Sequence, residues 1–385
     1  MRNLNIKGGR VLLRDGGLAI TDLALKDGLI VVEDGAAGVV PDGGTLDATG
    51  LLVLPGIVDI HGDAFERQFQ PRPGVGFPAS LALHDTEAQV LANGITTAFH
   101  GITLSWEPGL RSLQSWRTLL DALDAGSWVC DMRVHLRWEA FNLEALDTAV
   151  ADIQAGRVHL LAFNDHTPGI LKKTADPVLG VKFSDRAAMG LTEFAALANR
   201  VAARSGEIPA ALDRISAASR EAGIPMASHD DEAIATRDGF RARGARICEF
   251  PITEAVGRAA RDAGDYVVMG SPNVVRGGSH LGWASAAKMA EAGICNILSS
   301  DYFYPAMMQA ALILADRNEL DLARAWALIS ANPAAAAGLT DRGVIATGLR
   351  GDIVLVDPAR KRVVATFAQG RIAYLSAEGA ARLRL

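Results

Sequence analysis

The sequence predicts an α/β protein, with a TIM-like (β/α)8 barrel joined to a small β-sandwich domain that both chain ends build together. About eight strand-like runs alternate with alanine-rich amphipathic stretches through the middle of the chain, as a (β/α)8 barrel requires. Short strands separated by turns occupy both ends, and neither end is long enough to form a core of its own. A doubly wound sheet is the alternative, but no glycine-rich phosphate fingerprint follows the first strand, so the barrel is favoured.

The terminal segments carry strand signals at residues 4–6, 11–13, 23–25 and 28–32, and again at 352–357, 362–368 and 371–375. Lys26-Asp27-Gly28 lies between two apolar runs, which is typical of a hairpin turn. We therefore expect residues 1–54 and 343–385 to form the composite β-sandwich domain and residues 55–342 to form the barrel.

The barrel strands are expected at residues 58–60, 96–102, 134–138, 160–164, 225–228, 247–252, 266–269 and 296–299. Helical periodicity marks intervening stretches such as 284–291 and 310–317. No internal repeat or long low-complexity linker interrupts this order.

Composition narrows the class of protein. The net charge of −6 and the pI near 5.8 argue against a nucleic-acid or anionic-membrane surface, although a small phosphorylated substrate is still compatible. Three widely spaced cysteines do not form a disulfide framework and indicate a reducing compartment. The N-terminus resembles no signal peptide and no apolar run is long enough to span a membrane, so we expect a cytoplasmic protein. The sequence leaves a homo-oligomer open.

Metal-competent side chains follow the predicted barrel strands. His61 and Asp63 end the first strand, where alternation places both on one face. The carboxyl ends of barrel strands meet at one mouth, so later strand ends should join them there. The predicted ligands are His61, Asp63, Glu139, His166, His229 and Asp301, a mixed nitrogen and oxygen set that suits two divalent ions, Zn²⁺ or Mn²⁺.

Each of these residues could instead have a structural role. A lone buried histidine is more often a satisfied core group than a ligand. Glu139 has Arg137 and Arg133 nearby as ion-pair partners. Asp230 and Asp231 are expected to bind substrate or to orient His229.

An anion-binding loop is expected at residues 269–283. Arg276, Gly277, Gly278, Ser279 and His280 offer a guanidinium, flexible amides, a hydroxyl and an imidazole, which suits a phosphate or polyphosphate. Arg72, between two prolines, is a second candidate. The alternative for the loop is a tight turn with a solvated arginine.

The chain resembles the metal-dependent amidohydrolase superfamily and, within it, the diphosphatases that act on α-D-ribose 1-methylphosphonate 5-triphosphate in the carbon–phosphorus lyase pathway. The matching segments, in chain order, are LPGIVDIHGD with PRPGV, SHDD, EFPIT, MGSPNVVRGGSH, ILSSDYFYP and NPAAAAGLTDRGVI. The resemblance implies the same barrel with a β-sandwich from both termini, a metal site, and Glu139 in place of the superfamily's bridging carbamylated lysine.

The sequence departs from the family pattern near the expected site. The superfamily commonly has His-x-His where this chain has His61-Gly62-Asp63, although the diphosphatases carry an aspartate there. The other departures are Ala64, Phe77 and Leu281-Gly282-Trp283. They bear on the exact substrate more than on the chemistry.

The expected reaction is hydrolysis of a phosphoanhydride with release of diphosphate. Two divalent ions would lower the pKa of a water, Asp301 would accept its proton, and His280 would protonate the leaving oxygen. The alternative is an amidohydrolase that acts on an amide or amidine, as a deaminase, cyclic-amide hydrolase or deacetylase. A non-catalytic binding subunit is a third reading, which predicts missing metal ligands.

Overall fold

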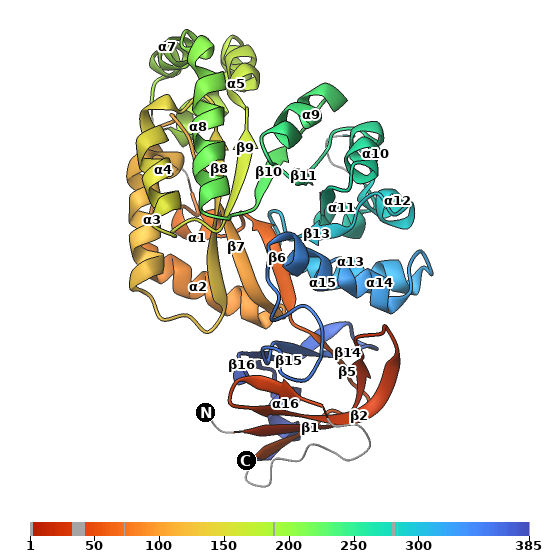
Figure 1. The fold of residues 1–385 in the computed structure, drawn as a ribbon. Coiled ribbons are helices and arrows are strands. Elements are labelled where there is room, and N and C mark those ends of the chain that lie inside the picture. The colour runs from red at the N-terminus through yellow and green to blue at the C-terminus, as the bar shows by residue number, and fades with distance from the viewer. Residues whose placement is uncertain are drawn as a thin grey trace.

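A computed structural model describes residues 3–32, 43–72, 74–187, 189–278, 282 and 284–384. Its upper part is a barrel of eight parallel strands in sequential order (Figure 1). These strands are β6 (Ile57–Gly62), β7 (Ile95–Leu104), β8 (Asp131–Glu139), β9 (Leu160–Asn164), β10 (Met226–His229), β11 (Ile247–Glu249), β12 (Tyr266–Gly270) and β13 (Ile297–Ser299). Each strand overlaps one run expected from the sequence.

The last strand returns to the first just past its end. A parallel bridge joins Gly62 to Asp301, the Asp301 amide donates to the His61 carbonyl (3.0 Å), and the Asp63 amide donates to the Asp301 carbonyl (2.8 Å). Sequential parallel pairing with this closure confirms the barrel and excludes the doubly wound sheet, whose strand order reverses.

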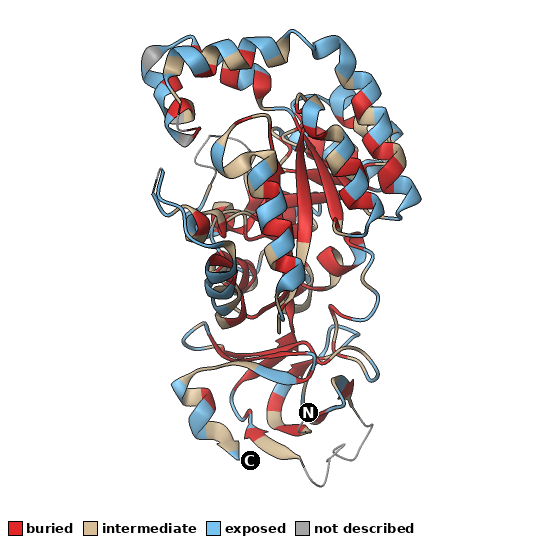
Figure 2. Cartoon of the chain, turned by 90° about the vertical axis from the view of Figure 1, so that its left-hand side faces the viewer, coloured by how far each residue is buried: buried red, intermediate tan, exposed pale blue. Residues whose placement is uncertain are grey.

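Most of the helices surround the barrel. The helices of this part of the chain are α1 (Glu66–Phe69), α2 (Ala79–Ala92), α3 (Leu113–Ala125), α4 (Leu146–Gln154), α5 (Thr167–Thr174), α6 (Pro177–Arg186), α7 (Leu191–Ala202), α8 (Ile208–Glu221), α9 (Ile234–Ala242), α10 (Glu254–Asp262), α11 (Ser271–Arg276), α12 (Ala286–Glu291), α13 (Ala306–Asp316), α14 (Leu322–Ala327) and α15 (Ala331–Ala336). Helices α5, α6 and α7 pack on one another at the top of Figure 1. Figure 2 shows the amphipathic pattern of the helices, which alternate buried and exposed residues along their length.

Both chain ends form a separate nine-stranded sheet below the barrel (Figure 1). It contains β1 (Leu4–Leu12), β2 (Leu18–Lys26), β3 (Leu29–Val31), β4 (Gly44–Asp47), β5 (Leu52–Pro55), β14 (Ile353–Asp357), β15 (Arg362–Ala368), β16 (Arg371–Leu375) and β17 (Leu383–Arg384), with α16 (Ala377–Arg382) before the last strand. The runs expected separately at 4–6 and 11–13 are one strand, because Gly8 at φ 70° allows a bulge that keeps β1 continuous.

The barrel interior is apolar below and polar above. Ala227 and Ile247 lie in a buried apolar cluster, and the next residues on the same faces of their strands are His229 and Glu249. The β6–β7 ladder shifts register between Asp59 and Gly62, next to His61. The fold thus places polar side chains at the carboxyl ends of the strands, over an apolar core.

No helix among the described residues is both long enough and apolar enough to cross a membrane.

Candidate active site

A cavity of about 180 Å³ opens at the carboxyl ends of the barrel strands. It brings together side chains from residue 61 to residue 302 of the chain. Its lining residues are His61, Asp63, Arg137, His229, Asp230, Phe250, Met269, Gly270, Asn273, Gly278, Ala284, Asp301 and Tyr302. Four of the six predicted metal ligands, His61, Asp63, His229 and Asp301, therefore face one space.

An inner cluster of metal-competent groups lies at the base of the cavity. His61, His229 and Glu249 each offer a ligand atom, and these atoms lie within 4.8 Å of one another. His61 Nδ1 is 3.0 Å from Glu249 Oε2, and the His61 and His229 rings are 5.2 Å apart. His135 stands behind them, with its Nε2 3.9 Å from Glu249 Oε1.

An outer cluster lies nearer the solvent. It consists of His166, His229 and Asp230, whose ligand atoms again lie within 4.8 Å of one another. Glu139 supports it, because its Oε1 is 2.5 Å from His166 Nδ1 and its Oε2 accepts the His166 amide (3.2 Å). Glu139 thus pairs with His166, whereas the sequence suggested Arg137 or Arg133 as its ion-pair partner. An imidazole nitrogen has one lone pair, so His229 cannot serve both clusters through the same atom.

Burial pushes the inner groups toward their uncharged forms. It lowers the pKa of His61 well below its ordinary value and that of His135 to about 3. It also raises the pKa values of Asp63 and Glu249. Neutral imidazole is the form that binds metals, and buried carboxylates gain most from a cation.

The inner cluster fits a divalent cation on its own geometry. His135 Nε2 and Glu249 Oε1 are buried and have no hydrogen-bond partner among the described residues. Such atoms cost free energy unless a partner such as a metal satisfies them. Nitrogen and carboxylate oxygen donors suit Zn²⁺ or Mn²⁺.

Asp63 and Asp301 complete the cavity wall. Arg137 Nη1 donates to Asp63 Oδ2 (3.0 Å). Burial, with Asp63 as the next cause, raises the pKa of Asp301 to about 7. Asp59 ties the two strand ends together, since it accepts from the His61 amide (3.3 Å) and from the Ser300 hydroxyl (2.5 Å).

Three cavity residues have left-handed backbones although none is glycine. Asp230, Phe250 and Asp301 have φ values of 57°, 51° and 55°, and each follows closely after a barrel strand. Such backbones cost about 1 kcal/mol or more each and cluster at functional sites. They turn the chain over the mouth of the barrel.

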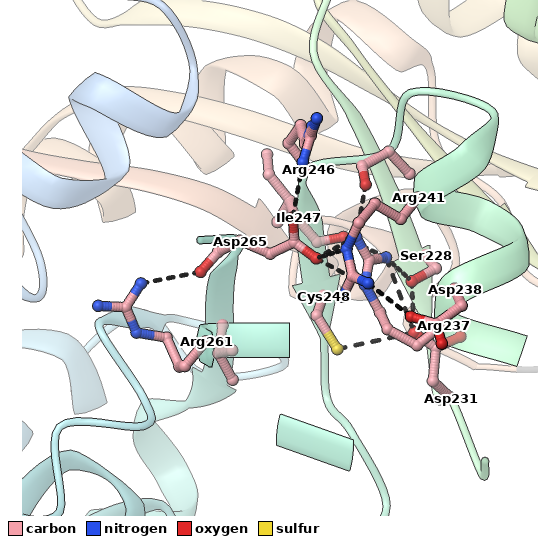
Figure 3. A network of polar contacts seen from close by, with 12 residues as sticks. Ser228, Asp231, Arg237, Asp238, Arg241, Arg246, Ile247, Cys248, Arg261 and Asp265 are labelled. Atoms are coloured by element: carbon pink, nitrogen blue, oxygen red, sulfur yellow. Dashed lines mark hydrogen bonds and ion pairs between the residues drawn. The ribbon is translucent and has the colours of Figure 1, made fainter. Parts of the chain in front are cut away.

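Asp231 lies outside the cavity, in a buried network around Arg237 (Figure 3). Its carboxylate accepts from the Ser228 hydroxyl and the Cys248 thiol, and only 1% of its surface is exposed. Arg237 in turn donates to Ser228 Oγ and Asp265. The network fixes the end of β10, where His229 and Asp230 stand, so Asp231 orients the site instead of lining it.

The predicted anion loop reaches the cavity in part. Gly278 lines it, and Gly277 ends α11 with φ 81°. Arg276 is exposed and donates to the Tyr302 hydroxyl (3.2 Å) at the rim. Arg72 lies on an exposed turn bridged to Val75, away from the cavity lining. Ser279 and His280 lie outside the described residues.

Sequence reasoning missed several side chains at this site. Arg137 and His135 alternate with Glu139 on β8, and the sequence placed all three on one face but assigned a site role to Glu139 alone. Glu249 ends β11 and obeys the same strand-end rule as His229. Arg67 donates to the Tyr302 carbonyl, and no sequence pattern indicated that contact.

Comparisons with known proteins agree with this geometry. An amidohydrolase family model matches residues 52–376. The α-D-ribose 1-methylphosphonate 5-triphosphate diphosphatase of Escherichia coli (strain K12) is 34% identical over 322 residues, covering 80% of this chain and 84% of the relative. An adenine deaminase of Methylobacterium nodulans is 26% identical, covering 99% of this chain and 60% of the relative.

Solved structures share the fold at low identity. Dihydropyrimidinase from Brevibacillus agri superposes with a TM-score of 0.65 at 14% identity, covering 98% of this chain and 95% of the other. Molinate hydrolase gives a TM-score of 0.66 at 15% identity, covering 96% and 94%. The family match over most of the sequence shows that the chain belongs to the amidohydrolase family.

Proposed function

We propose that this protein is a metal-dependent hydrolase that cleaves a phosphoanhydride and releases diphosphate from a sugar 5-triphosphate. The substrate class follows the E. coli relative, named for α-D-ribose 1-methylphosphonate 5-triphosphate. One observation carries the proposal: guanidinium groups lie beside metal-competent clusters. Arg137 lines the cavity, and Arg276 and Arg67 both donate to Tyr302 at its rim. Polyphosphate recognition relies on such groups.

The two clusters around His229 are the proposed metal ligands, and Asp63, Glu139 and Asp301 are the remaining predicted ones. A bound divalent cation supplies Lewis acidity and lowers the pKa of water. Glu139 orients the His166 ring. Glu249 either orients the His61 ring or binds the cation next to it. Zn²⁺ and Mn²⁺ both suit this donor set.

Asp301 is the proposed general base. Its carboxylate lines the cavity beside the metal-competent clusters, where it can accept a proton from water. Its backbone bonds to His61 and Asp63 fix its position at the barrel closure. The expected donor to the leaving diphosphate is His280.

A screen of sugar and nucleoside 5-triphosphates with Zn²⁺ or Mn²⁺, assayed for released diphosphate, tests the proposal. Asp301→Asn should lower turnover by about 1,000-fold or more, because the base is lost, while metal content by elemental analysis stays near wild type. Full activity in this variant would refute the base assignment. Absence of diphosphate release from every triphosphate would refute the function.

The second candidate is hydrolysis of an amide or amidine, which the likeness to an adenine deaminase favours. Such a substrate makes little use of Arg137, Arg276 and Arg67. Release of ammonia from adenine or ring opening of a cyclic amide, without diphosphate release from triphosphates, would select this function.

A further inference from the structure

Arg137 is held in the cavity by unusual partners. Only 6% of its surface is exposed, and its two terminal nitrogens contact Asp63 Oδ2 (3.0 Å) and His229 Nε2 (3.3 Å). Its Nε has no hydrogen-bond partner among the described residues. Gly101 on β7 leaves room for it, because a Cβ there would lie 3.1 Å from Arg137 Cδ.

The contact with Arg137 occupies the lone pair on His229 Nε2. A guanidinium can only donate, so His229 Nε2 is the acceptor. In a neutral ring the proton is then on Nδ1, which lies 3.2 Å from Asp230 Oδ1 but makes no hydrogen bond to any described residue. A metal ion that binds His229 through Nε2 needs the same lone pair. Arg137 and a cation therefore compete for His229, whereas Asp63 has two oxygens and can keep its bond to Arg137.

The charges that line the cavity indicate what the Arg137 guanidinium could bind once it no longer contacts His229. Asp63, Asp230 and Asp301 line the cavity, and among its described lining residues Arg137 carries the one permanent positive charge. An anionic substrate needs a counter-charge inside these walls. A planar guanidinium suits phosphate oxygens.

We propose that Arg137 is the interior phosphate-binding residue of this site, and that metal binding at His229 turns its guanidinium from the imidazole to a phosphoryl oxygen of the substrate. The inference rests on the proposed function, which supplies the phosphorylated ligand. It adds the residue that links metal loading to anion recognition.

Inorganic phosphate binding to the metal-loaded protein, measured by calorimetry, tests the anion role. Arg137→Met should bind phosphate about 30-fold more weakly than wild type, since a charge-assisted hydrogen bond is lost. Arg133→Met is the matched control, because Arg133 lies on the same strand, pairs with Asp131 and is absent from the cavity lining. Equal phosphate affinity in Arg137→Met and wild type would overturn the proposal.

Zn²⁺ affinity tests the competition between Arg137 and the cation for His229, and it needs no turnover. It is measured by competition with a chromophoric chelator. Arg137→Met should bind Zn²⁺ about tenfold more tightly, because the competing donor and its positive charge are gone. Unchanged or weaker Zn²⁺ binding would overturn the competition for His229.

Arg137→Lys keeps the test decisive if the methionine variant fails to fold. The ammonium keeps the charge without the planar fork, so phosphate binding should be intermediate. Wild-type affinity for phosphate in the lysine variant would contradict the proposal. Both titrations measure binding, so they test the role of Arg137 alone. Failure of the wild type to hydrolyse triphosphates would refute the proposed function, and it would leave the result of the titrations unchanged.

Discussion

Arg237 and Arg137 are both buried arginines, but their guanidinium groups are held differently. Arg237 on α9 is fully buried, and its nitrogens all donate to fixed partners: Asp265, Ser228 Oγ and the carbonyls of Ile247 and Ala245 (Figure 3). Arg137 on β8 faces a cavity, leaves Nε unpaired among the described residues, and shares His229 with a prospective ligand. A saturated buried charge holds a fold together, whereas a partly satisfied one is available for binding.

The largest expected difference between the two arginines is in stability. Arg237→Met should lower the free energy of unfolding by about 4 kcal/mol, because it removes the central partner of buried Asp265 and Ser228. Arg137→Met should cost about 1 kcal/mol, since its few partners reach the cavity. Urea denaturation of both variants measures this. Equal losses would remove the distinction between a structural and a functional arginine.

His100 on β7 is a third kind of buried polar group, without a partner for Nε2 among the described residues and outside the cavity. Burial lowers its pKa from 6.5 to about 4. Between these pH values the unfolded chain binds a proton that the folded chain does not, so stability is lost as pH falls through this window. The loss attributable to His100 should be about 3 kcal/mol from pH 8 to pH 4.

His100→Leu should remove that part of the acid sensitivity. Urea denaturation of both proteins at pH 8, 6 and 4, in the presence of a chelator, gives the comparison. Parallel curves for wild type and variant would mean that His100 is not neutral and unpaired in the folded protein.

Glu249 allows a carboxylate of the metal-competent cluster to be compared with a buried structural carboxylate. Glu249→Gln should weaken Zn²⁺ binding about 30-fold, because the amide neither ligates as well nor orients His61 by charge. Asp152→Asn is the control, since this buried carboxylate accepts from Trp116 Nε1 outside the cavity. Chelator competition measures both. Equal effects of the two substitutions would remove Glu249 from the metal centre.

The barrel could be predicted because its strands are buried on both faces and read as apolar runs. The run 134–138, for example, lies within β8. Short β4 was not predicted, since its four residues include a glycine and an aspartate.

The site was predicted where a strand end was placed correctly. His229 ends β10 as expected, but the sixth strand was expected to continue to residue 252, which put Glu249 inside it. Arg137 was read as a local partner of Glu139, whereas its partner Asp63 is 74 positions away. Pairing across the barrel depends on side-chain geometry, which strand periodicity does not contain.

Gly101 offers the smallest and most specific test of how Arg137 is placed. In Gly101→Ala the new Cβ would lie 3.1 Å from Arg137 Cδ, so the flexible arginine stem must shift while the strand remains intact. We expect phosphate affinity to fall about fivefold and the free energy of unfolding to change by less than about 1 kcal/mol. Gly169→Ala on α5 is the control, because beyond its own helix backbone and chain neighbours no atom of the described residues lies within 4 Å of its added Cβ. Calorimetry and urea denaturation measure the two quantities, and unchanged phosphate affinity in Gly101→Ala would show that the gap on β7 does not set the position of the guanidinium.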